Sequence, residues 1–365
     1  MRLQRVLISG GGTGGHIFPA IAIADALKKI VPDVEILFIG AKGRMEMEIV
    51  PSAGYSIESI EIEGFNRNNI LANVSIFFKV WKSINSCKSI IKHFNAQIAI
   101  GTGGFVSGPV LWAAANMRLP IFIQEQNSVP GITNRILAHR AKLIFTAYPA
   151  MEKYFNSKKI IYSGNPVRSA ILNSTPGREN SCAYFGFNPT MPVLFVYGGS
   201  QGSVSINKAL ISSLVHFEKN NIQVLWQTGK LFFEDALNYV RDNGLKLIKI
   251  FKFINEMQYA YGASNLCISR AGAMAISELA LKGVPAILVP LPSAAHNHQY
   301  HNAMTLDRAG AAICLEEVHL ENKLSRIVLD LIFNNEKLKQ YTSKISQFAR
   351  PGASESIVET ILSTT

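Results

Sequence analysis

Two segments of the chain share one order of features: a short apolar strand, a glycine-rich turn and the start of a helix. Val6-Leu7-Ile8-Ser9 runs into the glycines of residues 10–15, and Val193–Tyr197 runs into those of residues 198–202. After each segment, apolar runs rich in Val and Ile alternate with helical patterns, which is typical of a parallel sheet with helices on both faces. The repetition predicts an α/β protein with two doubly wound, Rossmann-like domains facing a cleft, and 365 residues suffice for both.

The apolar runs place the predicted strands and the domain boundaries. In the first domain we expect strands at 5–9, 34–39, 97–101, 120–123 and 143–146, with helices over 16–30 and 131–139. In the second we expect strands at 192–197, 223–227, 246–251, 265–269 and 286–289. The predicted division is 1–163, a proline-containing linker over 164–178, a second domain over 179–347, and a C-terminal helix over 348–365 for which a return to the first domain is one alternative.

The charge of the chain is uneven. The net charge is +11, and no acid lies between Glu63 and Glu125. Such a surface favours an anionic partner: nucleic acid, anionic lipid or a phosphorylated substrate. Four scattered cysteines favour a reducing, cytosolic compartment, and no signal peptide or membrane span is expected. Any membrane contact is therefore predicted to be peripheral.

The glycine-rich turns at 10–15, 101–108 and 198–202 are candidate ligand sites, because glycine lets a ligand approach the backbone and a helix N-terminus attracts anions. A tight turn is the alternative. The first turn matches G-x-G-x-x-G, but Gly40-Ala41-Lys42 stands where an NAD site needs an acid, which leaves an NADP-binding module as one alternative. No Walker lysine occurs, which disfavours an ATPase.

Further candidate site residues lie near the ends of the strands predicted in the C-terminal half of the chain. Glu278 follows the small residues of 269–277, where a carboxylate can accept two ribose hydroxyls; a solvated helix glutamate is the alternative. His296, His298 and His301 do not complete a metal-ligand set, and the chain has no D-x-D. We predict no metal and no cofactor.

Residues 70–92 form an apolar stretch with interspersed lysines. Its aromatic content exceeds what one core-facing helix face needs, which favours an interfacial helix, with an ordinary core helix as the alternative. The candidate membrane residues are Ile70, Phe77, Phe78, Trp81, Lys79 and Lys82.

Several motifs in order along the chain resemble one family. They are G-G-T-G-G-H at 11–16, G-T-G-G-F-V-S-G at 101–108, E-Q-N at 125–127, G-N-P-V-R at 164–168, G-G-S-Q-G at 198–202, S-R-A-G-A at 269–273 and H-Q-x-x-N-A at 298–303. This set resembles the MurG family, the bacterial N-acetylglucosaminyltransferases of peptidoglycan synthesis. The family often has histidine before E-Q-N, where this chain has Gln124, and an acid before the His-Gln pair, where this chain has Asn297.

The resemblance implies a metal-independent, inverting GT-B glycosyltransferase. It would move N-acetylglucosamine (GlcNAc) from UDP-GlcNAc to the C4 hydroxyl of the muramoyl sugar of lipid I (undecaprenyl-pyrophosphoryl-MurNAc-pentapeptide), giving lipid II. This places the chain peripherally on the cytoplasmic face of the inner membrane, in cell wall biogenesis, cell shape and cell division. The implied partners are an anionic membrane surface and other cell-wall enzymes, with no nucleic acid. A UDP-GlcNAc 2-epimerase of the same architecture is the alternative enzyme.

The same resemblance implies roles for individual residues. His16 is the candidate base for the acceptor hydroxyl, with Glu125 as the alternative. Ser200 and Gln201 would hold the diphosphate with Arg168, Ile254 would meet the uracil through its backbone, and Glu278 would bind the ribose. The remaining implied substrate-binding residues are Thr13, Gly14, Gly15, Asn127, Ala273, Met274, Ala275, Ile276, Ser277, Gln299 and Asn302.

Overall fold

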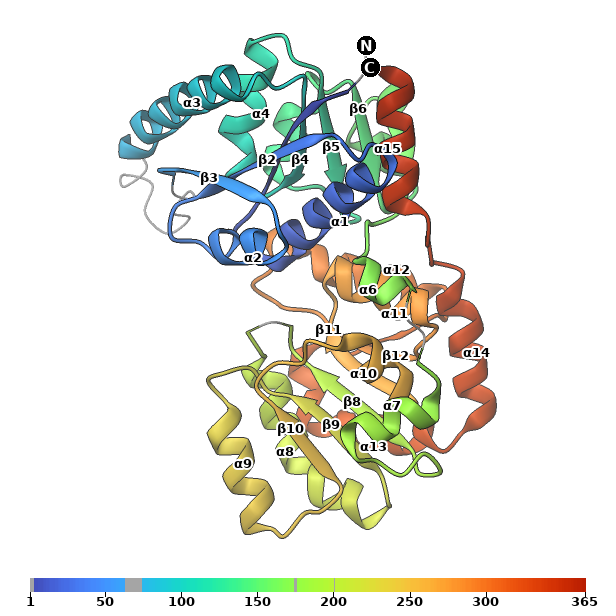
Figure 1. The fold of residues 1–365 in the computed structure, drawn as a ribbon. Helices are drawn as coiled ribbons and strands as arrows, with labels where there is room; N and C mark the ends of the chain where they lie inside the picture. The colour runs from blue at the N-terminus through green and yellow to red at the C-terminus, as the bar shows by residue number, and fades with distance from the viewer. Residues whose placement is uncertain (1–2, 63–73, 174–175, 200) are drawn as a thin grey trace. The chain divides into compact units, whose positions relative to one another are not determined.

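A computed structural model of the chain describes residues 3–62, 74–173, 176–199 and 201–365, without the side chains of 74–79 and 173. The chain divides into two compact units, unit 1 with residues 1–169 and 350–365 and unit 2 with residues 170–349. Each unit is a parallel sheet with helices on both faces (Figure 1). The predicted α/β class with two Rossmann-like domains is confirmed.

Unit 1 contains a seven-stranded sheet in the order β3-β2-β1-β4-β5-β6-β7. Its elements are β1 (Arg5–Gly10), α1 (Gly14–Ile30), β2 (Glu35–Ala41), α2 (Glu46–Ser52), β3 (Ser56–Ile60), α3 (Val74–Phe94), β4 (Ile98–Gly103), α4 (Ser107–Asn116), β5 (Ile121–Glu125), α5 (Ile132–Leu137), β6 (Leu143–Thr146), η2 (Met151–Lys153), η3 (Ser157–Lys159), β7 (Ile160–Tyr162) and α15 (Ala353–Thr364). The helix α6 (Ser169–Asn173) lies at the boundary, inside the segment predicted as linker.

Unit 2 contains a six-stranded sheet in the order β10-β9-β8-β11-β12-β13. Its elements are α7 (Arg178–Phe185), β8 (Val193–Tyr197), α8 (Val204–Lys219), β9 (Gln223–Gln227), α9 (Phe233–Asp242), β10 (Ile248–Phe251), α10 (Met257–Ala263), β11 (Leu266–Arg270), α11 (Ala273–Lys282), β12 (Ala286–Val289), η4 (Ala295–Asn297), α12 (His298–Arg308), β13 (Ile313–Cys314), η5 (Glu317–His319), α13 (Leu320–Ile332) and α14 (Asn335–Ser346).

Both sheets reverse their strand order beside the first strand of the unit. β1 pairs in parallel with β2 on one side and β4 on the other, and β8 pairs with β9 and β11 in the same way. The carboxyl ends of these neighbouring strands form the crevice in which such sheets bind ligands. All three glycine-rich turns of the sequence lie at these ends, so the topology places them where ligands bind.

The helix α15 belongs to unit 1 although its sequence follows unit 2. It packs against α1 (Figure 1), and Ile357, Val358 and Ile361 are buried in the same core cluster as Ile17 and Ile23 of α1. The Lys29 Nζ atom lies 3.2 Å from Glu355 Oε1 at the edge of this contact. The last helix of the chain therefore completes the core on one face of the first sheet.

Candidate active site

The first glycine-rich turn of unit 1 is filled from within the protein. Glu46 of α2 is completely buried, and its carboxylate accepts hydrogen bonds from Gly12 N and Ala41 N, each at 3.0 Å. A Cβ atom on Gly11 would lie 2.3 Å from Glu46 Oε1, so glycine is required there to admit the carboxylate. The Glu46 carboxylate thus occupies this turn, and Gly12 N has a hydrogen-bond acceptor within the protein.

The second turn packs directly on the first. Gly104 has φ +84°, and a Cβ atom there would lie 2.2 Å from Gly11 O. Gly11 N donates to Gly103 O at 3.4 Å, and the β1–β4 register shifts at Gly10. The two turns therefore form one close-packed layer of backbone, as expected for segments that line the same strand ends.

His16 lies in the first turn of α1, next to the end of β4. Its Nδ1 atom is 2.9 Å from Thr102 O and 3.1 Å from Gln126 Oε1. Gly103 has φ +104°, and a Cβ atom on it would lie 2.8 Å from His16 Nδ1, so the missing side chain makes room for the imidazole. Among the residues that the structure describes, His16 Nε2 forms no hydrogen bond.

Glu125, the other candidate base, clamps the loop that follows β5. Its side chain is 1% exposed, and its two carboxylate oxygens accept from Asn127 N (3.0 Å), Asn127 Nδ2 (3.3 Å), Gly131 N (3.0 Å) and Asn134 Nδ2 (2.8 Å). Four donors engage the lone pairs of this carboxylate. Glu125 therefore organises the E-Q-N loop and the start of α5.

The other predicted residues of unit 1 surround these groups. Thr13 and Gly15 are exposed at the start of α1, with Gly14 partly buried between them, and Asn127 is partly buried. Arg168 places its guanidinium 4.6 Å from the centre of the Phe18 ring, a cation–π contact with α1. Arg168 thus belongs to unit 1.

The predicted membrane residues lie on or before α3. Trp81 is 68% exposed, while Cys87 and Ile91 of the same helix are buried in the core, so the helix has a separate core-facing side. Lys82 Nζ lies 3.2 Å from Glu61 Oε2. Ile70 and the side chains of Phe77, Phe78 and Lys79 lie outside the described residues. In the part of the chain that the structure describes, no helix is both long and apolar enough to cross a bilayer.

The glycine-rich turn of unit 2 is contacted by a neutral side chain where that of unit 1 holds a carboxylate, because Gln227 of β9 donates through Nε2 to Gly199 O at 3.0 Å. Gly199 has φ +92°, and a Cβ atom on it would meet nothing within 4 Å. A Cβ atom on Gly202 would lie 2.0 Å from Thr228 O, so the turn is tight on its inner side only. Gln201 is exposed, and Ser200 lies outside the described residues.

A chain of hydroxyls holds Glu278 in place. Tyr261 OH donates to Glu278 Oε2 at 2.8 Å, and Tyr197 OH lies 3.0 Å from Tyr261 OH. All three side chains are less than 10% exposed. Burial, and next the Glu278 carboxylate, raise the pKa of Tyr261 well above its usual range, so its hydroxyl stays protonated and serves as a donor. One oxygen of Glu278 is thereby fixed by the protein.

The segment after β11 has a polar support beneath it. Asn302 is fully buried and donates through Nδ2 to Ala271 O at 3.4 Å, and Ser277 Oγ bonds Ala273 O at 3.0 Å. Ala275 is partly buried, whereas Ala273, Met274 and Ile276 are buried. Gln299 Oε1 accepts from Leu291 N at 3.1 Å, and the backbone N–H of Ile254 donates to Gln227 Oε1 at 2.8 Å.

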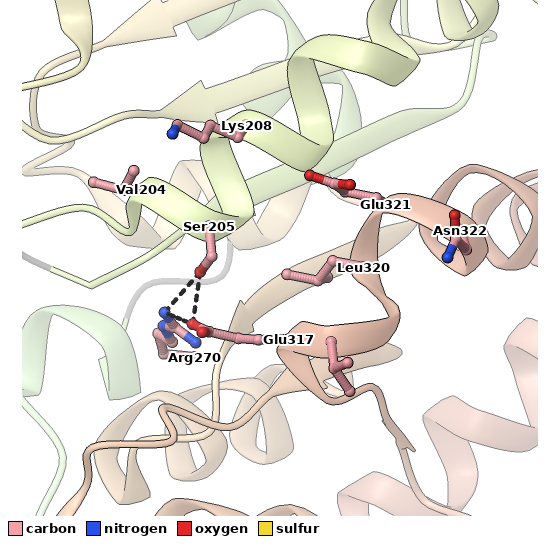
Figure 2. Close-up of a pocket in the computed structure, with 9 residues that line it drawn as sticks. Val204, Ser205, Lys208, Arg270, Glu317, Leu320, Glu321 and Asn322 are labelled. Atoms are coloured by element: carbon pink, nitrogen blue, oxygen red, sulfur yellow. Dashed lines mark hydrogen bonds and ion pairs between the residues drawn. The ribbon is translucent and has the colours of Figure 1, made fainter.

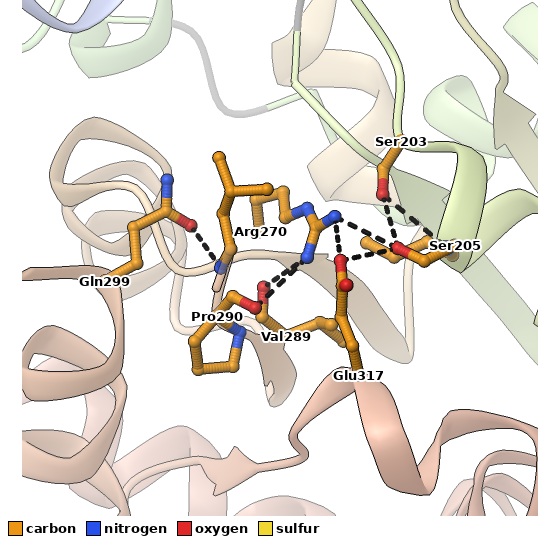
Figure 3. A network of polar contacts seen from close by, with 9 residues as sticks. Ser203, Ser205, Arg270, Val289, Pro290, Gln299 and Glu317 are labelled. Carbon is orange, nitrogen blue, oxygen red and sulfur yellow. Dashed lines mark hydrogen bonds and ion pairs between the residues drawn. The ribbon is translucent and has the colours of Figure 1, made fainter. Parts of the chain in front are cut away.

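Arg270 joins several strand ends of unit 2, a role that the sequence analysis did not anticipate. It donates to Val289 O (3.4 Å), Pro290 O (3.1 Å) and Ser205 Oγ (3.0 Å), and it forms an ion pair with Glu317 (Figure 3). Ser205 Oγ also donates to Glu317 Oε1 at 2.6 Å. An arginine directly after a strand is a weak sequence signal, and Glu317 carries none.

A cavity of about 640 Å³ lies beside this network, between the starts of α8 and α13. Figure 2 shows Lys208 and Glu321 on its two sides with Ser205, Arg270 and Glu317 at one end. Within the described residues, no group of three or more His, Cys, Asp or Glu side chains could hold a metal ion.

Comparison with known proteins identifies the family to which this chain belongs. The N-terminal domain of glycosyltransferase family 28 matches residues 6–146, and its C-terminal domain matches residues 193–357. The chain belongs to glycosyltransferase family 28. More particularly, it is similar to curated enzymes named UDP-N-acetylglucosamine--N-acetylmuramyl-(pentapeptide) pyrophosphoryl-undecaprenol N-acetylglucosamine transferase. It is 42% identical to that of Parabacteroides distasonis (99% of this chain, 98% of the relative) and 44% identical to that of Bacteroides fragilis strain NCTC 9343 (98% and 95%).

Solved structures agree with this assignment. The crystal structure of Acinetobacter baumannii MurG matches with a TM-score of 0.77 at 27% identity over 99% of both chains. A putative UDP-N-acetylglucosamine 2-epimerase from Listeria monocytogenes matches with a TM-score of 0.72 at 13% identity over 100% of this chain and 97% of the other, a likeness of fold alone. The predicted resemblance to the MurG family and the GT-B fold is confirmed.

Proposed function

We propose that this chain transfers N-acetylglucosamine from UDP-GlcNAc to the C4 hydroxyl of the muramoyl sugar of lipid I, forming lipid II. The observation that carries the proposal is 42–44% identity to enzymes of that name over 98–99% of the chain. The test is incubation with UDP-GlcNAc and a short-chain lipid I analogue. We expect a disaccharide product and UDP in equal amounts; release of N-acetylmannosamine and UDP without an acceptor would instead indicate an epimerase.

We assign the donor to unit 2. In this proposal the turn at 198–202, which precedes α8, binds the diphosphate through backbone amides, with Ser200 and Gln201 as the polar side chains. Glu278 then accepts the ribose hydroxyls, and the Ile254 carbonyl faces the uracil. Residues 273–277 line the nucleotide, and Gln299 binds the sugar, with Asn302 supporting the segment after β11.

We assign the acceptor and the base to unit 1. Of the two candidates, His16 is the better base, because Glu125 is buried and its oxygens accept four hydrogen bonds. The acceptor oxygen attacks C1 as the bond from C1 to the diphosphate oxygen breaks, which inverts the anomeric centre. The hydroxyl proton passes to His16 Nε2, and the electron pair leaves with UDP. Thr13, Gly14, Gly15 and Asn127 are the further substrate-binding residues that we assign to unit 1.

Charge on the departing diphosphate is stabilised in this proposal by backbone amides and by Arg168, without a metal ion. The chain has no D-x-D, which supports this mechanism. We expect activity to persist in EDTA. Abolition by the chelator with restoration by magnesium would contradict the metal-free mechanism.

We further propose that unit 1 binds the cytoplasmic surface of the inner membrane, where the acceptor's polyprenyl chain resides. The support is an exposed Trp81 on α3 within the acid-free stretch between Glu63 and Glu125. Binding to phosphatidylglycerol-containing vesicles should fall with salt and weaken in Trp81→Ser, whereas Val318→Ser, at an exposed apolar residue of unit 2, should bind like the unmodified chain. Equal binding by all three proteins would contradict the assignment of this surface. Roles in cell shape and division, with other cell-wall enzymes as partners, would follow from the product.

A further inference from the structure

Four polar side chains of unit 1 form a continuous hydrogen-bonded chain that ends at His16. Asn165 follows β7, Gln124 lies in β5, Gln126 follows β5, and His16 belongs to α1. Asn165, Gln124 and Gln126 are 4%, 0% and 1% exposed, so water does not compete for their amides. Each side-chain amide has two orientations that exchange its oxygen and nitrogen atoms. The hydrogen-bond partners at the two ends of the hydrogen-bonded chain decide which orientation each amide takes.

The direction is fixed first at Asn165. Its Nδ2 atom lies 3.2 Å from Gln126 O, a carbonyl that can only accept, so this atom is the donor. Asn165 Oδ1 therefore faces Gln124 and accepts from Gln124 Nε2 at 3.0 Å. Gln124 Oε1 is then the atom left to accept from Gln126 Nε2.

A second carbonyl fixes the direction independently. Gln126 Nε2 lies 2.6 Å from Thr102 O, which again requires the nitrogen to be the donor. Both anchors thus turn Gln126 Oε1 toward His16 Nδ1, at 3.1 Å. His16 Nδ1 also lies 2.9 Å from Thr102 O, so both of its neighbours are acceptors and Nδ1 must carry a hydrogen.

We propose that Gln126, held by Gln124 and Asn165, is a positioning residue that fixes His16 as its Nδ1–H tautomer. In a neutral imidazole with a hydrogen on Nδ1, the lone pair is on Nε2, the atom that must accept the acceptor's proton. The catalytic meaning rests on the proposed function, whereas the tautomer itself does not.

The arrangement also prepares the protonated state. When His16 takes a proton at Nε2, Nδ1–H keeps the same two acceptors, so the chain needs no reorganisation during the reaction. Gln124 stands where the family often has histidine. An amide there donates to Asn165 and accepts from Gln126 without titrating, so the three amides that support His16 carry no charge at any pH.

The first test reads the tautomer without activity. In 15N spectra of the full chain with labelled histidine side chains, the His16 signals are assigned by their absence in His16→Gln. We expect a protonated Nδ1 in the neutral ring. A neutral His16 with its hydrogen on Nε2 would overturn the proposal whatever the variants do.

The second test compares variants that remove the amide at similar volume. Gln126→Met should give a mixture of tautomers and lower kcat at least about 10-fold, with the KM for UDP-GlcNAc changed less than twofold. Gln124→Met leaves the bond from Gln126 to Thr102 in place and should lower kcat less. The matched control is Gln97→Met, because Gln97 caps the other end of β1 through Gln4 N and Arg5 N.

The outcomes separate this proposal from the proposed function. Unchanged kcat in a folded Gln126→Met that has lost the Nδ1–H tautomer would overturn the positioning role. An equal loss in Gln97→Met would also overturn it, by showing a general effect on unit 1. An unmodified chain that forms no disaccharide would refute the proposed function, and the 15N spectrum would still decide the tautomer.

Discussion

The two units begin with the same motif and use it differently. In unit 1 the turn at 10–15 encloses the Glu46 carboxylate, and a Cβ atom on Gly11 would lie 2.3 Å from it. In unit 2 the turn at 198–202 is contacted by a neutral amide, since Gln227 Nε2 donates to Gly199 O at 3.0 Å, and no described atom counted around the Cβ position of Gly199 lies within 4 Å. A glycine-rich turn after a parallel strand therefore specifies a close approach to the backbone, but it does not specify whether the approaching group is the protein's own side chain or a ligand.

In the proposed reaction, this difference corresponds to separate roles for the two units. Unit 1 holds the Glu46 carboxylate inside its turn, and we propose that the nearby His16 imidazole takes the proton. Unit 2 has a neutral amide at its turn and a separate carboxylate, Glu278, that is held by Tyr261, which in turn bonds Tyr197. In the proposed reaction, variants of unit 1 should alter kcat or stability, and variants of unit 2 should alter donor affinity.

The largest effect is expected at His16. His16→Ala should lower kcat by about 10²–10⁴-fold, because general-base catalysis is lost, while UDP affinity measured by calorimetry stays the same. His93→Ala, at an exposed histidine of unit 1, is the control. A loss below tenfold would assign the base to another group, and a parallel loss of UDP affinity would erase the distinction between the units.

The next effect is on stability. Glu46→Ala should lower the free energy of unfolding by about 2–4 kcal/mol, because Gly12 N and Ala41 N lose their acceptor in a buried site. Urea denaturation measures this, with exposed Glu48→Ala on the same helix as the control. If Glu46→Ala is as stable as the control, the first turn does not depend on its internal anion, and the comparison between the two turns is wrong.

A smaller effect is expected in donor binding. Glu278→Ala should weaken UDP binding by about 1–3 kcal/mol, because the ribose hydroxyls lose a charged acceptor. The control is Glu336→Ala, at an exposed acid in the first turn of α14. Unchanged calorimetric affinity in a folded Glu278→Ala would remove Glu278 from the donor site.

The smallest effect is expected at Tyr261, which contacts Glu278 and is one hydrogen bond further from the proposed donor. Tyr261→Phe should weaken UDP binding by about 0.5–1.5 kcal/mol, because Glu278 loses the donor that fixes Oε2. Tyr341→Phe, on α14 of the same unit, should bind UDP normally. If Tyr261→Phe weakens UDP and an analogue without ribose hydroxyls equally, the tyrosine does not act through Glu278.

Most of the central strands could be predicted because they are buried on both faces and read as continuous apolar runs. The strands β3, β7 and β13 could not, since they lie toward the sheet margins and are short or, like Ser56–Ile60, polar at alternate positions. The glycines of the sequence also predict three turns that a ligand can approach closely, with a tight turn as the alternative. The sequence cannot show what fills them, because Glu46 and Gly12 are brought together only by the tertiary fold.

The same limit applies to the candidate site. His16 and Glu278 follow strand ends and stand out in the sequence, whereas nothing in the sequence shows which residues support them. The Gln124–Gln126–Asn165 chain and the Arg270–Glu317 pair join residues far apart in sequence, and an isolated glutamine or glutamate carries no signal of such a partner. Side-chain orientation, which decides the His16 tautomer, is a property of these long-range contacts alone.

The position of α15 has a consequence for biosynthesis. Unit 1 leaves the ribosome first, yet its core includes Ile357, Val358 and Ile361 from the end of the chain. Residues 170–349 must be made in between, which takes roughly 10–40 s at typical rates of translation. For that time the face of α1 that α15 later covers is bare apolar surface, a natural target for chaperones. The nascent first unit therefore completes its core only after residues 170–349 and α15 have been synthesised.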